Sequence, residues 1–396
     1  MFTRTDAGAA PLTEPKYWIA LSRVGGLGKV LFRRLILRFE TPEAVFRAPE
    51  IEICRVEGCR PATAKAVKSF CDWDGVDDEV DKAEKAGAHI VSFIDPSYPA
   101  NLRETHDPPP YLYVKGGLIE EDRVSVAIVG SRMATDYGRK LTRKMARELS
   151  AKGVTVVSGG ARGIDTEAHR GALEGGGRTI AVLGCGIDVV YPGENKELFA
   201  RIAERGAVVS EYPMGTPPES QNFPPRNRII SGISMGVLVM EAAEDSGSLI
   251  TAQYSLEQGR EVYALPGSVG SPTSKGTNCL IKKGAKLVEK PDDILEDLFP
   301  YIKGYLRERD IGVDEASEED GARREEFDSA SGAIERLGLE GDEATMFGLI
   351  TAEPSHIDQL AEKSGIAVPK ALSLLLGMEL KGAVRQVPGM RFVRED

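Results

Sequence analysis

The chain has 396 residues, of which 41% are hydrophobic and 28% charged, and its formal net charge is -11 at pH 7. This length predicts two or three domains, and the composition is ordinary for a globular protein. The negative charge argues against attraction of the whole surface to nucleic acid or membrane, but it does not exclude a local basic groove. There is no run of 18 apolar residues and no apolar signal segment after Met1, so we expect a cytoplasmic protein with no membrane partner.

The five cysteines, at positions 54, 59, 71, 185 and 279, show no Cys-x-x-Cys spacing. The first three are close in sequence, but no histidine lies near them. We therefore expect reduced thiols, no metal site and no cofactor.

The N-terminal region, residues 1–84, reads as a small domain of short helices. Val24–Lys29 and Val56–Pro61 each place a glycine turn before a helix, as in helix-hairpin-helix (SAM-like) modules. Backbone N–H groups at such a helix start can hold a DNA phosphate. A small helical bundle with glycine caps is an equally good interpretation, because the second turn is degenerate. A strand-like segment (89–93) and a rigid proline-rich lead (108–114) follow.

Residues 85–300 alternate apolar, β-rich runs with helical stretches. Such a pattern predicts a parallel sheet covered on both faces, so the fold class is α/β with an extended Rossmann-like, doubly wound sheet. The helix candidates include Tyr137–Lys152 and Leu249–Gly259. The strand candidates are Val124–Val129, Val154–Val157, Thr179–Leu183, Ala207–Ser210, Gly236–Met240, Glu261–Ala264 and Lys286–Val288.

Glycine, serine and basic residues follow the predicted strands. Sheets of this kind bind ligands at the carboxyl ends of their strands. Glycine permits close backbone approach, serine donates a hydroxyl group, and helix starts offer unpaired N–H groups. Several such turns at one edge predict an anion site that covers several phosphates. The candidate residues in these turns are Gly130, Ser131, Arg132, Ser158, Gly159, Gly160, Arg162, Gly163, Gly184, Gly186, Ser246, Gly247, Ser248 and Lys275.

The segment that follows the fourth of these strands is the most informative one. Phe223 and two prolines predict a turn, and Arg226, Asn227 and Arg228 come next, before an apolar Ile-Ile pair. Guanidinium groups match phosphate oxygens, and a phenyl ring offers a face for base stacking. We expect rigid cations at the rim of the domain. The alternative is that the two arginines pair with carboxylates inside the protein.

The motifs of two common nucleotide sites are missing. The first strand is not followed by Gly-x-Gly-x-x-Gly, and there is no Walker A sequence. Asp165 and His169 lie four residues apart, but Asp165 is better placed to meet a helix dipole while His169 packs nearby. We therefore predict a binding protein and not an enzyme.

Five ordered motifs resemble the DprA/Smf family, the DNA-processing protein A group. They are Gly-Ser-Arg (130–132), Ser-Gly-Gly-Ala-Arg-Gly-Ile-Asp-Thr-Glu-Ala-His (158–169), Gly-Cys-Gly-Ile-Asp-Val-Val-Tyr-Pro (184–192), Phe-Pro-Pro-Arg-Asn-Arg-Ile-Ile-Ser-Gly (223–232) and Ser-Gly-Ser-Leu-Ile-Thr-Ala (246–252). The resemblance implies an extended Rossmann domain that binds single-stranded DNA and forms a homodimer. It also implies that the protein loads RecA recombinase onto incoming DNA during natural transformation. By motif, Arg132 would be the arginine of the phosphate pocket, with segments 158–163 and 223–228 lining the same groove.

The C-terminal part reads as a separate unit. Residues 301–330 form an acidic stretch with few apolar residues, which predicts a solvated linker. Residues 331–396 show a helix-turn-helix pattern followed by a two-stranded wing, and this resembles the winged-helix tail of some family members. The predicted recognition helix has few cations, so duplex binding and protein contact both remain open.

Two other functional classes remain. A nucleotide-processing enzyme of the lysine-decarboxylase-like group would share the sheet, but Pro266–Ser271 departs from the phosphate loop of that group. A nucleotide-sensing module would bind a mononucleotide without affinity for long DNA. For assembly, the short late strand 286–288 predicts a sheet edge, and we expect it to pair in a homodimer.

Overall fold

The computed structural model describes residues 14–298, 341–350, 355–366, 368–380, 383–387 and 391–394. The chain divides into two compact units, Met1–Tyr305 and Leu306–Asp396, each described here by itself. The predicted acidic linker, residues 301–330, lies outside the described residues. Among the described helices, none combines the length and apolar character needed to cross a bilayer.

The first unit begins with a bundle of short helices around buried apolar side chains such as Trp18, Leu35 and Ile53. The two predicted glycine turns are present, and Gly26 and Gly58 adopt the positive φ angles of 80° and 85° that such turns require. The helices are α1 Pro15–Ser22, α2 Lys29–Phe39, α3 Pro42–Arg47, α4 Glu50–Cys54, α5 Pro61–Lys68 and α6 Trp73–Lys85.

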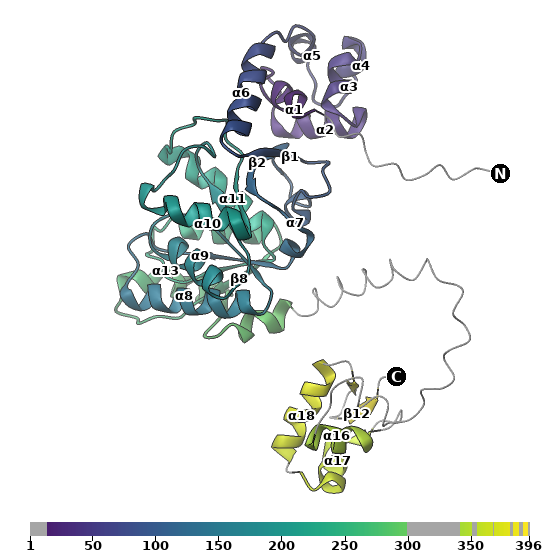
Figure 1. Ribbon diagram of the computed structural model, residues 1–396, viewed down its shortest axis with the longest axis vertical. Helices are drawn as coiled ribbons and strands as arrows, with labels where there is room; N and C mark the ends of the chain where they lie inside the picture. The colour runs from purple at the N-terminus through teal and green to yellow at the C-terminus, as the bar shows by residue number, and fades with distance from the viewer. Residues whose placement is uncertain are drawn as a thin grey trace, which may run out of the picture. The chain divides into compact units, whose positions relative to one another are not determined.

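A nine-stranded sheet forms the centre of the first unit (Figure 1), in the order β1-β2-β6-β5-β4-β3-β7-β8-β9. The seven strands from β3 to β9 pair in parallel, as predicted. The strands are β1 His89–Ser92, β2 Tyr111–Gly116, β3 Ser125–Val129, β4 Thr155–Ser158, β5 Thr179–Leu183, β6 Ala207–Ser210, β7 Gly236–Val239, β8 Glu261–Ala264 and β9 Lys286–Leu287.

The interpretation of residues 108–114 as a rigid lead is wrong for most of its length. Residues from Tyr111 onward form β2, which pairs antiparallel with both β1 and β6. The three prolines end before the strand begins, so they do not remove hydrogen-bond donors from the ladder. The sheet is therefore a parallel core extended by an antiparallel pair.

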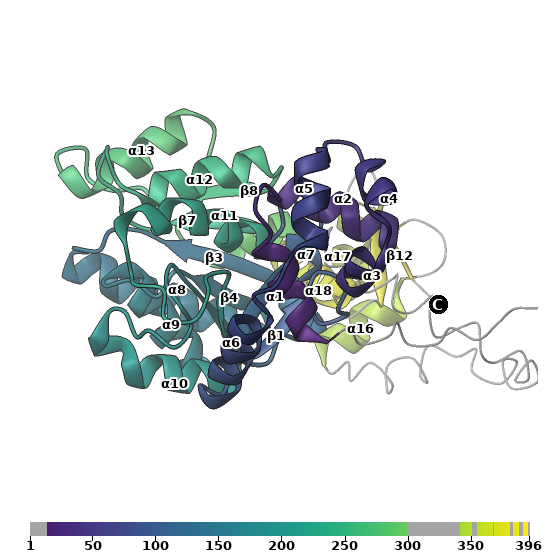
Figure 2. The ribbon, with the colours of Figure 1, turned by 90° about the horizontal axis from the view of Figure 1, so that it is seen from above.

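Helices cover both faces of the sheet (Figure 2), with α8, α9 and α10 on one side and α11, α12 and α13 on the other. Strand β3 illustrates why both faces must be covered, because residues 126–129 place apolar side chains on each face of the sheet. Val126 and Ile128 pack toward α8 and α9, while Ala127 and Val129 pack toward α11 and α12. The covering helices are α8 Asp136–Ala151, α9 Ile164–Glu174, α10 Lys196–Arg205, α11 Phe223–Ile233, α12 Ser248–Glu257 and α13 Lys275–Lys282. A further short helix, α7 Ala100–Arg103, lies between β1 and β2 in the sequence.

A buried carboxylate fixes the helical bundle to the sheet. Glu79 of α6 accepts hydrogen bonds from the Tyr113 hydroxyl of β2, from Arg23 of the bundle, and from the Met214 amide at 3.2 Å. Burial of the ring raises the pKa of Tyr113, so its hydroxyl stays a donor. The bundle and the sheet therefore share one polar network across their contact.

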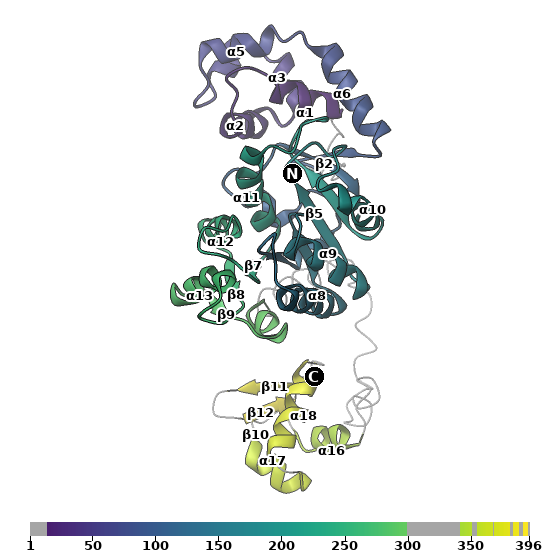
Figure 3. The ribbon, with the colours of Figure 1, turned by 90° about the vertical axis from the view of Figure 1, so that its left-hand side faces the viewer.

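The second unit contains the predicted helix-turn-helix and wing (Figure 3). Helix α16 Asp342–Gly348 precedes α17 Ile357–Ser364 and α18 Val368–Leu380, and the strands are β10 Ser355–His356, β11 Val384–Val387 and β12 Arg391–Arg394. Strands β11 and β12 pair antiparallel, and β10 joins the other edge of β12. Lys370 at the start of α18 forms an exposed ion pair with Asp342 at 2.5 Å. The winged-helix prediction is confirmed.

Candidate nucleic-acid interface

A cavity of about 570 Å³ lies at the carboxyl edge of the parallel strands. Its walls come from the loops after β3, β4, β5, β6 and β7 and from the N-terminal parts of α11 and α12. Segments more than 100 residues apart in the sequence meet here, because the strands that carry them are neighbours in the sheet. The lining residues are Val129, Gly130, Ser131, Arg132, Met133, Ala161, Asp165, Tyr191, Pro218, Ser220, Phe223, Pro224, Arg226, Asn227, Ile230, Ala243, Ser246, Gly247, Ser248, Ile250 and Thr251.

The loops after β3 and β4 touch through backbone atoms. The Ser131 carbonyl accepts a hydrogen bond from the Ile164 amide at 3.2 Å, and the Ser131 amide donates to the Glu241 carbonyl at 2.8 Å. Gly163 has a φ of 77°, and a β-carbon there would lie 2.3 Å from the Ser131 carbonyl oxygen. Only glycine fits this crossing, which brings the Gly-Ser-Arg turn beside the start of α9.

Arg226 is buried at the base of the cavity, with 4% of its surface exposed. Its guanidinium donates to the Gly159 carbonyl at 2.8 Å and to the Val182 carbonyl, at the ends of β4 and β5. Burial lowers the pKa of Arg226 to about 10, and nearby Asp165 opposes that shift. Burial likewise raises the pKa of Asp165 to about 6, and Arg226 opposes it. Arg226 therefore stays charged at neutral pH, and the ionised Asp165 beside it offsets part of its positive potential.

Arg132 provides the exposed cation of the cavity. Its guanidinium carbon lies 5.0 Å from the centre of the Phe223 ring, within the range of a cation–π contact. The Tyr191 and Phe223 rings lie 5.8 Å apart at an interplanar angle of 32°. A guanidinium and two aromatic faces thus line one opening, so the cavity offers contacts to a phosphate and to a flat base.

Nine predicted site residues line this cavity together. They are Gly130, Ser131, Arg132, Phe223, Arg226, Asn227, Ser246, Gly247 and Ser248. Four more lie directly behind its wall. Ser158 donates to the Ile128 carbonyl at 2.6 Å, β-carbons at Gly159 and Gly184 would meet Arg226 and Phe223, and Gly163 makes the crossing described above.

The remaining predicted residues lie elsewhere. Arg162 is exposed and pairs with Glu194. Gly160 packs against Phe199, Gly186 against the Pro213–Gly215 turn, and Lys275 is exposed at the start of α13. The structure places these four outside the wall of the cavity.

Two expectations for the segment at Phe223 are wrong. Phe223 and the two prolines begin α11 and do not form a turn, because proline fits the first helical turn, where its missing N–H has no intrahelical partner. The arginines are not at an exposed rim, since Arg226 is 4% and Arg228 5% exposed. Arg228 pairs with Glu211 and with Asp107 at 3.2 Å, which is the internal pairing that the sequence left open.

The cavity also contains apolar residues that sequence reasoning missed. Met133 is 85% exposed and Ile250 is 39% exposed, and both belong to the lining. Met133 follows the Gly-Ser-Arg turn and Ile250 lies in the first turn of α12, so the signal was an exposed apolar side chain just after a glycine- or serine-rich turn.

His169 has the structural role that its spacing suggested. Its Nδ1 lies 2.7 Å from the Thr179 hydroxyl, which itself donates to the Val156 carbonyl at 2.7 Å. Because the Thr179 hydroxyl already donates its proton to Val156, it can only accept from His169. The proton of the histidine is therefore on Nδ1. Complete burial lowers the pKa of His169 to about 3 and keeps the ring neutral.

Comparison with known proteins shows the family to which the chain belongs. Residues 89–299 match the family described as DNA recombination-mediator protein A, and residues 335–390 match the DprA winged helix domain. Protein Smf of Synechocystis sp. is 36% identical over 399 residues, which cover 96% of this chain and 99% of the relative. Protein Smf of Escherichia coli is 42% identical over 307 residues, 77% of each chain. The X-ray structure of DprA from Streptococcus pneumoniae has 38% identity and a TM-score of 0.64, and the match covers 72% of this chain and 98% of that one.

The chain therefore belongs to the DprA/Smf family of DNA recombination mediators.

We predict that His169 makes folding acid-sensitive. An unfolded histidine titrates near pH 6.5 and the buried one near 3, so the unfolded state binds more protons in between, and stability falls as pH is lowered. Between pH 7 and pH 5 this contributes a loss of about 2 kcal/mol. Urea unfolding of a His169→Gln variant should lack that part of the pH dependence. A His89→Gln variant, which changes an exposed histidine, should keep it, and equal slopes for all three proteins would contradict the assignment. Asp165, whose pKa is raised to about 6, contributes a pH dependence of stability of the opposite sign below pH 6, and this contribution is the same in the wild type and both variants.

Proposed function

We propose that this protein binds single-stranded DNA in the cavity at the carboxyl edge of its sheet, without catalysing a reaction. The observation that carries the proposal is Arg132 stacked on Phe223 at the opening of a cavity with a buried cation beneath it. Arg132 suits a backbone phosphate, and the Phe223 and Tyr191 rings suit an unpaired base. Family membership among DNA recombination mediators supports the choice of DNA as the ligand.

The shape of the site favours single strands over duplexes. The Tyr191 and Phe223 rings are half-buried in the lining of the cavity, which suits a splayed base better than a base pair stacked inside a duplex. Base stacking tolerates any base, so sequence preference should be slight.

We further propose that the bound strand is passed to RecA recombinase in the cytoplasm during natural transformation. The support is the family resemblance of the whole chain to recombination mediators. Non-enzymatic strand delivery also fits the buried state of Asp165 and His169, which are engaged in internal hydrogen bonds.

The proposed assembly is a homodimer through the Rossmann-like domain. Strand β9 is the last strand of the sheet, so one of its edges has no neighbouring strand in the described part of the chain. Its Leu287 is 44% exposed. Proteins usually cover such edges, and two-fold pairing is the commonest way for a soluble chain to do so.

A titration of DNA at several salt concentrations tests the function. We expect tight binding of a single-stranded oligonucleotide and much weaker binding of a duplex of the same length. Equal affinity for the two would reject the proposed site.

Replacing the three arginines by alanine should give two distinct patterns. Arg132→Ala removes an exposed phosphate contact, so the log–log salt slope should flatten by about 0.7 and affinity should fall alike for all sequences. Arg228→Ala removes a buried cation from the largely buried Glu211 carboxylate and from the partly exposed Asp107, so it should destabilise folding by roughly 3 kcal/mol and leave the slope unchanged. Arg226→Ala should show both effects, because this residue lines the cavity and holds two backbone carbonyls. An unchanged slope in the Arg132 variant would overturn the phosphate assignment.

The proposed homodimer and the proposed RecA partner can each be tested by a direct measurement. Light scattering at about 10 μM, a range in which even modest contacts persist, should give twice the mass of the chain, and a Leu287→Arg variant should shift it toward the monomer. The protein should also speed RecA filament growth on single strands. A monomer at that concentration, or an unchanged filament rate, would remove the corresponding partner from the proposal.

A further inference from the structure

Helix α2 of the helical bundle is unusually basic for this chain. Its eleven residues include Lys29, Arg33, Arg34 and Arg38 and no acidic residue, although the whole protein has a net charge of -11. Its inner face is apolar and buried, so all four cations lie on the remaining surface of the helix. A strip of one charge on an otherwise negative protein indicates a negatively charged ligand.

A second cavity, of about 230 Å³, opens beside this helix. It is lined by three cations against one carboxylate, and that carboxylate, Asp107, is already paired with Arg228. The exposed apolar residues of the same helix face, Val30 at 49% and Leu37 at 68% exposure, belong to the lining. The lining residues are Lys29, Val30, Arg33, Arg34, Leu37, His106, Asp107 and Pro108.

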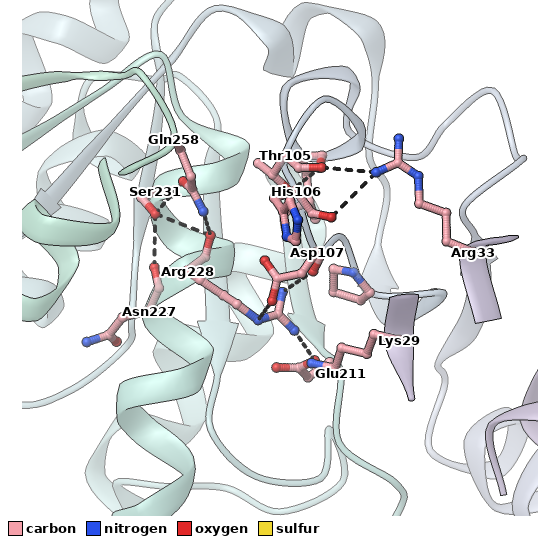
Figure 4. Close-up of polar contacts among 12 residues, drawn as sticks. Lys29, Arg33, Thr105, His106, Asp107, Glu211, Asn227, Arg228, Ser231 and Gln258 are labelled. Atoms are coloured by element: carbon pink, nitrogen blue, oxygen red, sulfur yellow. Dashed lines mark hydrogen bonds and ion pairs between the residues drawn. The ribbon is translucent and has the colours of Figure 1, made fainter. Parts of the chain in front are cut away.

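The cations of this cavity can turn toward a ligand without leaving a buried charge unpaired. Lys29 pairs with Glu211 at 2.7 Å, but the same carboxylate also holds Arg228 (Figure 4). Arg34 donates to the Glu57 carbonyl at 2.9 Å and lies 3.4 Å from its carboxylate, which is 84% exposed. Exposed pairs of this kind are weak and exchange readily with other anions.

Helix α11 connects the two cavities. Asn227 lines the first cavity, while the next residue, Arg228, holds Asp107 of the second. Figure 4 shows the Asn227 side chain directed away from the cluster that joins Arg228 to Lys29. One side of α11 thus lines the first cavity, and the ion pairs of Arg228 lead from its other side to Asp107 and, through Glu211, to Lys29 of the second cavity.

We propose that the cavity beside α2 is a second phosphate-binding subsite, where Lys29 and Arg34 contact the backbone of the DNA strand held in the first cavity. This inference rests on the proposed single-strand binding. Arg33 serves mainly as a support, because its guanidinium packs 5.7 Å from the Phe93 ring and faces the carbonyls of Thr105 and His106 at 3.5 Å. Val30 and Leu37 offer the apolar surface that sugars and bases can cover.

The test compares two oligonucleotide lengths and two double variants. One single strand has about 6 nucleotides, near the short end of the range that one strand-binding fold covers, and the other has about 20, beyond that range. The test variant is Lys29→Gln with Arg34→Gln. The matched control is Arg47→Gln with Lys82→Gln, which removes the same two charge types from exposed ion pairs of the same bundle, outside the cavity.

We expect the test variant to lose affinity for the long strand only. At about 0.15 M salt, each lost phosphate contact reduces affinity roughly fourfold, so loss of both should reduce it roughly 15-fold and flatten the salt slope by about 1.4. Affinity for the short strand should match that of the wild type, and the control variant should match it for both lengths. If thermal melting shows that the double variant does not fold, each single variant should give about a fourfold loss.

Three outcomes would overturn the proposal. Long-strand affinity equal to that of the control would exclude the subsite and leave an acidic protein segment as the ligand class that the strip fits. Equal losses for both lengths would show that the substitutions disturb the first cavity. If the wild-type protein binds neither the short nor the long oligonucleotide, the proposed function itself is rejected. If it binds the short oligonucleotide normally, only the second subsite is rejected.

Discussion

The buried guanidinium of Arg226 is the interaction on which the site depends. It joins the first turn of α11 to the backbone at the ends of β4 and β5, with Asp165 close enough to shift its pKa. Placing a cation at 4% exposure is unfavourable unless it has acceptors, and here the Gly159 and Val182 carbonyls and the Asn227 side-chain oxygen accept hydrogen bonds from it. Because α11 is held there, Phe223 stands beside Arg132 and Asn227 faces the cavity. The positive potential of the cavity is therefore part of the packing of the fold.

Arg228 performs the equivalent task on the neighbouring side of α11. Its contacts to Glu211 and Asp107 hold the helix against the end of β6 and the segment before β2. The same Glu211 carboxylate reaches Lys29 of the helical bundle. One helix thus carries two arginines with different roles, and a polar chain extends from Arg228 through Glu211 to Lys29 of α2.

Local charge, and not the total charge, decides what this protein can attract. The net charge of -11 would repel DNA from the surface as a whole. Concave, low-dielectric sites concentrate the potential of the few cations that line them, so a small basic region can act against the average. Here Arg132 and Arg226 line one cavity and Lys29, Arg33 and Arg34 line the other. Repulsion elsewhere on the surface would then favour ligands that enter these sites over unspecific binding.

The sequence alone determined the strand pattern, the winged helix and the edge of the sheet that carries the site. Those features are encoded locally, by apolar runs that alternate with helices and by glycine- and serine-rich turns after strands. It also placed Gly130, Ser131, Arg132 and Phe223 at one site, because their motifs follow strands of a single sheet. Only the tertiary structure decided that residues 111–116 extend the sheet as an antiparallel strand, since strand partners depend on contacts distant in sequence. It also decided that Arg226 and Arg228 are buried and that Met133 and Ile250 face the cavity. The physical reason is that burial and pairing are set by neighbours from other elements, so of two adjacent residues Asn227 can line a cavity while Arg228 is buried in ion pairs.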